Sequence, residues 1–204
     1  MSLIATIVNF KMSVFVPLAL GFFGLGTGYL IWGPEELVGY PQRDRKVDIT
    51  TGIWGVWMPG FLQFLTGIIL FVGLTWFGSF TSKPLYMAAL AFTAYGVHWF
   101  ALGLGRTFGG DPRPNAAMAV PFMVISAVGA IVFFGASDNP VGALFVGLFA
   151  VYVCEFFASL GLARINAKFW ERALGFVHIV VGLWLMYLTI AAAVNFARGF
   201  HLPL

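Results

Sequence analysis

The chain has 204 residues, of which 60% are hydrophobic and only 9% are charged. Its formal net charge is +3, but Lys and Arg lie in short segments between apolar runs, where they orient membrane proteins, so the charge does not indicate nucleic-acid binding. Hydrophobic runs of about 20 residues recur along the chain, and each is long enough to cross a bilayer as a helix. One integral membrane domain over 1–204 is therefore expected, in a multi-pass protein of the cell inner or plasma membrane.

The apolar runs predict six spans, at 12–32, 51–75, 84–105, 115–136, 140–163 and 172–196. The expected fold class is an all-α membrane protein, a six-transmembrane-helix bundle. The segment 33–50 is a long polar connection, whereas 137–139 has room only for a tight turn. Of the 11 Lys and Arg residues, 3 lie on the side of the termini and 8 on the opposite side. The positive-inside rule then places both termini outside the cell.

Glycine is concentrated in the first two spans. Gly24 and Gly28 have the GxxxG spacing in the first span, and Gly52, Gly55 and Gly60 recur in the second. Small residues at this spacing let helix backbones approach closely in a membrane. We therefore expect tight packing against these two helices.

The centres of the spans mark a candidate constriction. At a rise of about 1.5 Å per residue, Phe23, Gln63, Tyr95 and the neighbourhood of Val151 fall at roughly equal depth. Gln63, Tyr95 and the nearby Thr93 carry polar groups that lipid cannot satisfy, so they are expected to face protein or a cavity. Two plainer interpretations stay open, in which Gln63 only stabilises the bundle by an interhelical hydrogen bond and Tyr95 is a packed aromatic residue.

Three ionisable residues lie off-centre, namely His98, Glu155 and His178. Each is displaced toward the basic side of its span by about 5–9 Å, so the three side chains can meet in one layer. An acid and two imidazoles at similar depth form a candidate proton relay or a vestibule for a weak acid. Alternatively, each His bonds a neighbouring helix and does nothing more, or the two hold a b-type haem. Bulky neighbours, Trp99 and Phe176, argue against a haem.

Arg106 and Arg113 flank a Gly-Gly-Asp-Pro loop after the third span. They form a candidate anion-attracting mouth, or they anchor the loop under the positive-inside rule. The chain has no HExxH, no GxSxG, no P-loop Lys and no Cys/His cluster at metal spacing. We therefore expect neither an enzyme nor a metal or other cofactor.

Several stretches resemble the acetate uptake transporter family, whose bacterial members include the succinate-acetate permease. Residues 92–99, Phe-Thr-Ala-Tyr-Gly-Val-His-Trp, resemble its Phe-Thr-Ser-Tyr-Gly-x-Phe-Trp. Residues 17–27 are similar to its glycine-rich first-span signature, and 59–67 to its glycine-glutamine stretch in the second span. The Pro-Asn-Ala at 114–116 falls where the family has the same tripeptide before its fourth span.

The resemblance implies a six-helix subunit in a homo-oligomer, a hexamer, in which each protomer has its own path for acetate or succinate, with protons. It also implies a constriction made by Phe23, Tyr95 and either Leu148 or Val151. The chain departs from the family in two respects. Residues 14–17 are Val-Phe-Val-Pro instead of Asn-Pro-Ala-Pro, and the family keeps its termini cytoplasmic, opposite to the charge count.

The functional hypothesis is a membrane channel or transporter for small monocarboxylate or dicarboxylate anions such as acetate or succinate, coupled to protons. Its partners are the carboxylate anion, the lipid bilayer and further copies of the chain. The alternative is a non-transporting accessory or scaffold subunit of a larger membrane complex. The missing first-span motif and the reversed charge bias favour that alternative.

Overall fold

The computed structural model describes residues 17–160 and 166–203. Within these ranges the regular structure is helical, as predicted, and the six-helix bundle is confirmed. Parts of two predicted spans, 12–16 and 161–163, lie outside the described residues. The six helical segments are α2 (Leu18–Val38), the long helix Arg45–Phe77, α5 (Pro84–Phe108), α6 (Pro114–Gly135), α7 (Asn139–Ser159) and α8 (Ala167–Arg198).

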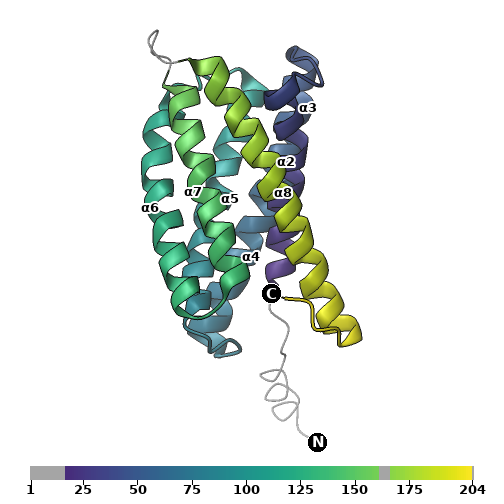
Figure 1. Cartoon of the computed structure of the whole chain (residues 1–204), viewed down its shortest axis with the longest axis vertical. Helices are drawn as coiled ribbons and strands as arrows, with labels where there is room; N and C mark the ends of the chain where they lie inside the picture. Colours follow the sequence, from purple (N-terminus) through teal and green to yellow (C-terminus); the bar gives the residue numbers. More distant parts are fainter. Residues whose placement is uncertain (1–16, 161–165, 204) are drawn as a thin grey trace, which may run out of the picture.

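Five helices in the described part of the chain are long and apolar enough to cross a membrane, and α2 is the sixth member of the bundle. The α2 helix contains several glycines and carries Glu35 and Glu36 in its last turn. It lies alongside α8 for much of its length (Figure 1). The chain is therefore an integral, multi-pass membrane protein.

The helices pack as a closed ring. Contacts join α2 to α4 (Leu62–Val72), α4 to α5, α5 to α6, α6 to α7, α7 to α8, and α8 back to α2. The contact between α5 and α6 is the smallest in this ring, although the two helices are consecutive in the chain (Figure 1). Buried aromatic and aliphatic side chains fill the interior.

The second span is one long helix with two wider turns. It runs through α3 (Arg45–Gly55), the π-helical segment η2 (Val56–Phe61), α4 and a second π segment, η3 (Gly73–Phe77). It begins at Arg45 rather than at the predicted 51 because the Asp44 side chain caps its end by accepting from the backbone N–H groups of Lys46 and Val47. Pro59 lies inside η2. Since proline has no backbone N–H, it interrupts the α-helical bonding there.

The predicted close packing of the glycine-rich spans is confirmed. A Cβ atom added to Gly24 would lie 2.5 Å from the carbonyl oxygen of Met58 in η2. A Cβ atom on Gly52 would lie 2.6 Å from the carbonyl oxygen of Gly103 in α5. Both distances are far shorter than real contacts, so only glycine permits the approach of these backbones.

Candidate functional site

Two cavities lie inside the ring, each with a volume of about 30 Å³. A cavity of this size holds about one or two water molecules. We call the first the apolar cavity; it is lined by Leu18, Phe22, Leu25, Gln63, Ala88, Ala91, Phe92, Tyr95, Phe133, Val141, Leu144, Phe145, Leu148 and Leu185. We call the second the acid–imidazole cavity; it is lined by Tyr29, Trp32, Glu36, His98, Trp99, Leu102, Val151, Tyr152, Glu155, Leu174 and His178.

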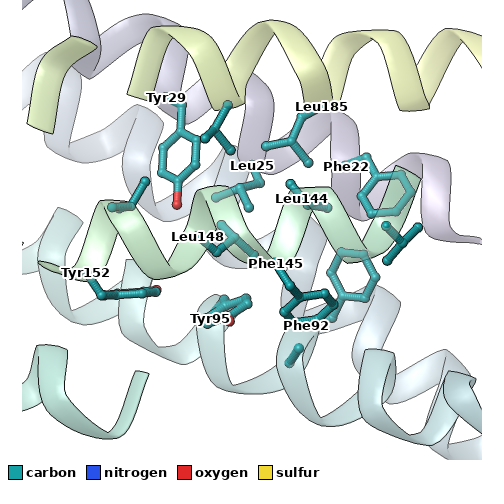
Figure 2. Packing of buried hydrophobic residues seen from close by; sticks show 14 of the residues in the cluster. Phe22, Leu25, Tyr29, Phe92, Tyr95, Leu144, Phe145, Leu148, Tyr152 and Leu185 are labelled. Atoms are coloured by element: carbon teal, nitrogen blue, oxygen red, sulfur yellow. The ribbon is translucent and has the colours of Figure 1, made fainter. Parts of the chain in front are cut away.

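Side chains from α2, α4, α5, α6, α7 and α8 close around the apolar cavity. Figure 2 shows several of them, including Phe22, Phe92 and Leu148. The ring centroids of Phe22 on α2 and Phe92 on α5 are 5.5 Å apart. Leu148 on α7 is 2% exposed and Leu185 on α8 is fully buried. The single amide in this wall is Gln63 from α4, which is also fully buried. These walls leave a volume of about 30 Å³, which holds about one or two waters rather than a carboxylate with four non-hydrogen atoms.

Tyr95 connects the wall of the apolar cavity to the wall of the acid–imidazole cavity. Its ring lines the apolar cavity, and its hydroxyl lies 2.9 Å from the hydroxyl oxygen of Ser126 on α6. The same ring stacks on Phe122 and on Tyr152, with centroid distances of 5.5 and 5.8 Å. Because Tyr152 lines the acid–imidazole cavity, the Tyr95–Tyr152 stack connects the walls of the two cavities. Figure 2 shows both side chains.

His98 and Glu155 face each other across the acid–imidazole cavity without bonding directly. His98 Nδ1 lies 3.2 Å from the hydroxyl oxygen of Tyr152. Its other ring nitrogen, Nε2, is 4.0 Å from Glu155 Oε1, which is too long for a hydrogen bond. Nε2 is buried and has no hydrogen-bond partner among the described residues. A water molecule or a polar solute atom can bridge the two side chains.

A second acid–imidazole pair completes the cavity. His178 Nδ1 lies 2.6 Å from Glu36 Oε2, and the His178 ring stacks on Tyr29 at a centroid distance of 4.4 Å. His98, Glu155 and His178 therefore share one cavity, and each is at most 7% exposed. Their function as proton sites stays a prediction.

Phe23 does not lie where the prediction put it. It is 43% exposed on the outer face of α2, and the adjacent Phe22 lines the apolar cavity instead. Successive side chains on a helix point about 100° apart, so a correct depth still left the direction of the ring unknown.

Thr93 is misplaced for the same reason. It lies about 200° around α5 from Tyr95 and lines an outer groove between α4, α5 and α6 with a volume of about 550 Å³. Its hydroxyl donates to the carbonyl oxygen of Ala89 at 2.8 Å. The two fifth-span candidates are distinguished by the cavities, since Leu148 lines the apolar cavity and Val151 lines the acid–imidazole cavity.

Arg106 is part of a buried ionic network rather than a free cation. Its guanidinium bonds the Glu35 carboxylate, and its Nε lies 3.1 Å from Asp48 Oδ1. The guanidinium carbon also lies 4.5 Å from the centroid of the Trp32 ring, in cation–π geometry. The Arg106 side chain is 8% exposed, and its two acidic partners offset most of the electrostatic attraction that it would exert on a solute anion.

Arg113 is exposed but is also paired. Its Nε lies 3.0 and 2.9 Å from the two carboxylate oxygens of Asp111. The hydrogen bonds from Arg113 lower the pKa of Asp111 to about 2, so this carboxyl is ionised throughout the physiological range. Both arginines of the predicted anion-attracting mouth are therefore paired with neighbouring acids, and their function as a mouth stays a prediction.

A haem does not fit between His98 and His178. The cavity that they share has a volume of about 30 Å³, and Tyr29 already covers one face of the His178 ring. Each Nδ1 atom is also engaged, one with Tyr152 and the other with Glu36. The two imidazoles are therefore held by protein groups.

Phe22, Tyr29, Glu36 and Tyr152 are among the lining residues that sequence reasoning missed. Glu36 was assigned to a polar connection because Gly33 and Pro34 precede it. The α2 helix instead continues through Pro34 and ends only at Gly39, whose φ of 75° is readily adopted by glycine. Pro34 alone does not show where the helix ends. Gly39 followed by Pro41 is the sequence pattern typical of a helix end.

No family model and no curated protein matches the sequence. The structure, however, is similar to the solved structure of the bacterial acetate channel SatP, with a TM-score of 0.69 and 18% sequence identity. The similarity covers 92% of this chain and 96% of that chain. The fold is therefore shared over nearly the whole length, in agreement with the resemblance of the motifs to the acetate uptake transporter family.

Proposed function

We propose that the chain is a channel or transporter for small carboxylic acids such as acetate or succinate, coupled to protons. The observation that carries the proposal is a pair of interior cavities within one protomer whose walls are connected by the Tyr95–Tyr152 stack. The fold shared with SatP supports a membrane channel at the level of architecture. The path runs from the acid–imidazole cavity, past the stack, into the apolar cavity.

The two cavities suit two successive steps. His98, Glu155 and His178 are titratable groups at one end of the path, where a carboxylate can gain a proton. The apolar cavity beyond them has no charged lining residue among the described residues. An ionised carboxylate is costly in such surroundings, whereas the undissociated acid is tolerated. Protonation in the first cavity therefore precedes passage through the second.

Passage requires the apolar cavity to widen. Its volume of about 30 Å³ holds one or two waters, so the described conformation is closed to acetate. Rotation of Phe22 or Leu148 away from the axis is a small change that widens it, because both side chains line the cavity and they come from different helices.

Uptake of labelled acetate into proteoliposomes tests the path. Leu148→Trp adds bulk at the constriction and should lower the rate by roughly tenfold or more. Leu148→Ala should raise the rate, since it removes side-chain volume there. Leu183→Trp is the matched control: Leu183 lies in α8 and is 59% exposed, so the same bulk faces outward.

Opposite effects of the two Leu148 substitutions, with normal uptake by Leu183→Trp, support the path. Equal rates in all variants would reject it and favour the accessory-subunit alternative. Competition by unlabelled succinate then tests the dicarboxylate substrate. The proposal also includes a homo-oligomer, which the family resemblance suggests is a hexamer. Native mass spectrometry of the detergent-solubilised protein measures the number of chains in it.

A further inference from the structure

Gln63 has an unused hydrogen-bonding group in the wall of the apolar cavity. Its side chain is 0% exposed and lines the apolar cavity. Neither the amide nitrogen nor the amide oxygen has a hydrogen-bond partner among the described residues. A buried amide without partners is destabilising, so such a group is usually satisfied by water or by a ligand. The cavity has room for about one or two waters, which a solute can replace.

The amide group defines the chemistry of the solute that replaces this water. It offers a donor N–H and an acceptor oxygen side by side. An undissociated carboxyl group offers the matching pair, an acceptor C=O beside a donor O–H, and a primary amide offers a C=O beside an N–H. A carboxylate has acceptors only, so one of its oxygens would face the Gln63 oxygen without a proton between them.

The surrounding walls favour the same neutral class. Phe22, Phe92 and Leu148 supply apolar surface for a short alkyl group. The described residues that line the apolar cavity include neither Lys nor Arg to balance an anion.

We propose that Gln63 recognises a neutral, planar donor–acceptor group, and that the path therefore carries small primary amides such as acetamide as well as the undissociated acid. The inference rests on the proposed function, because it assigns a second substrate class to the same path. Acetamide has the same number of non-hydrogen atoms as acetic acid and the same arrangement of methyl group and polar end. It needs no proton from His98 or Glu155.

Stopped-flow swelling of proteoliposomes in acetamide tests the proposal. The protein should raise acetamide permeability above that of protein-free liposomes, equally at about pH 5 and about pH 8, because the amide has no titration in this range. Acetate uptake should be faster at the lower pH, where more acid is undissociated. N,N-Dimethylacetamide, which has no N–H donor, should gain no protein-dependent permeability.

Gln63→Leu keeps the approximate size of the side chain and removes both polar atoms. We expect it to lower acetamide permeability about tenfold, which corresponds to the loss of hydrogen bonds in a dry site. Its thermal stability should equal or exceed that of the parent protein, since the Gln63 side chain has no hydrogen-bond partner among the described residues. Inhibition of acetate uptake by excess acetamide in the unmodified protein provides a second measurement that is independent of any variant.

The outcomes separate the two proposals. Acetate uptake without acetamide permeation or competition would overturn the inference and leave the proposed function standing. Acetamide permeation without acetate uptake would overturn the proposed function and leave the recognition by Gln63 standing. Acetamide permeation that is unchanged in Gln63→Leu would overturn the role of the amide group. Movement of neither solute would overturn both proposals.

Discussion

Replacing Arg106 by Met distinguishes an arginine that stabilises the bundle from one that attracts anions. In the structure the guanidinium bonds Glu35 and Asp48 and lies over the Trp32 ring. Met keeps much of the apolar length of the side chain but removes the charge and the donors. The substitution therefore leaves the Glu35 carboxylate, which is 2% exposed, without its main partner.

The expected loss of stability follows from the burial of this pair. Removing one partner of a buried ion pair costs about 3–5 kcal/mol. A chain of this size loses about 2–4 °C of melting temperature per kcal/mol, so the transition should fall by about 6–20 °C. Arg43 Nε still lies 3.3 Å from Glu35 Oε1, and Asp48 is 25% exposed. Both facts place the expected value toward the lower end of that range.

Tryptophan fluorescence during heating in detergent measures the shift. Arg113→Met is the matched control, because Arg113 is 73% exposed and its loss should leave the transition unchanged. Adding Glu35→Gln to Arg106→Met removes the stranded charge and should recover part of the loss. An unchanged melting temperature in Arg106→Met, combined with a weaker apparent affinity for acetate, would refute this reasoning and support the predicted anion-attracting mouth.

Three further substitutions test other contacts by the same thermal measurement. Gly24→Ala should lower the melting temperature, because its Cβ would lie 2.5 Å from a backbone oxygen of η2. Gly135→Ala is the control and should cause no loss, since no atom lies within 4 Å of the added Cβ. Equal shifts in the two variants would contradict the close approach of α2 and η2. Asp44→Ala removes the cap of α3 and should cost about 1 kcal/mol, or about 2–4 °C; no shift would mean that water replaces the cap. Asp111→Asn should have no effect, because the pair with Arg113 is exposed, and a clear loss would show that the pair anchors its loop.

Depth along the membrane could be predicted from the sequence. Each apolar run has a centre, and the rise of a helix is constant, so Phe23, Gln63, Tyr95 and the neighbourhood of Val151 were expected at one level. Gln63 and Tyr95 both line the apolar cavity, as does Leu148 near Val151, whereas Val151 itself lines the acid–imidazole cavity. The same calculation of depth placed His98 and Glu155 at a similar level, and both residues line the acid–imidazole cavity.

Direction around each helix could not be predicted in the same way. Phe22 and Phe23 are chemically identical, and the choice between them depends on which face of α2 packs against α8 and η2. Contacts between segments that are distant in the sequence could not be predicted either. Glu35 is 71 positions from Arg106 and Glu36 is 142 positions from His178, so no local pattern connects them.

Enclosure of both cavities within a single ring of helices has a genetic consequence. If the proposed path is correct, every chain in an assembly works alone, because the residues lining the path all come from that chain. A cell that co-expresses the normal protein with Leu148→Trp should lose activity in direct proportion to the fraction of mutant chains. Mutations at the constriction would then behave as recessive, and dominant inhibition would arise only from changes that disturb assembly.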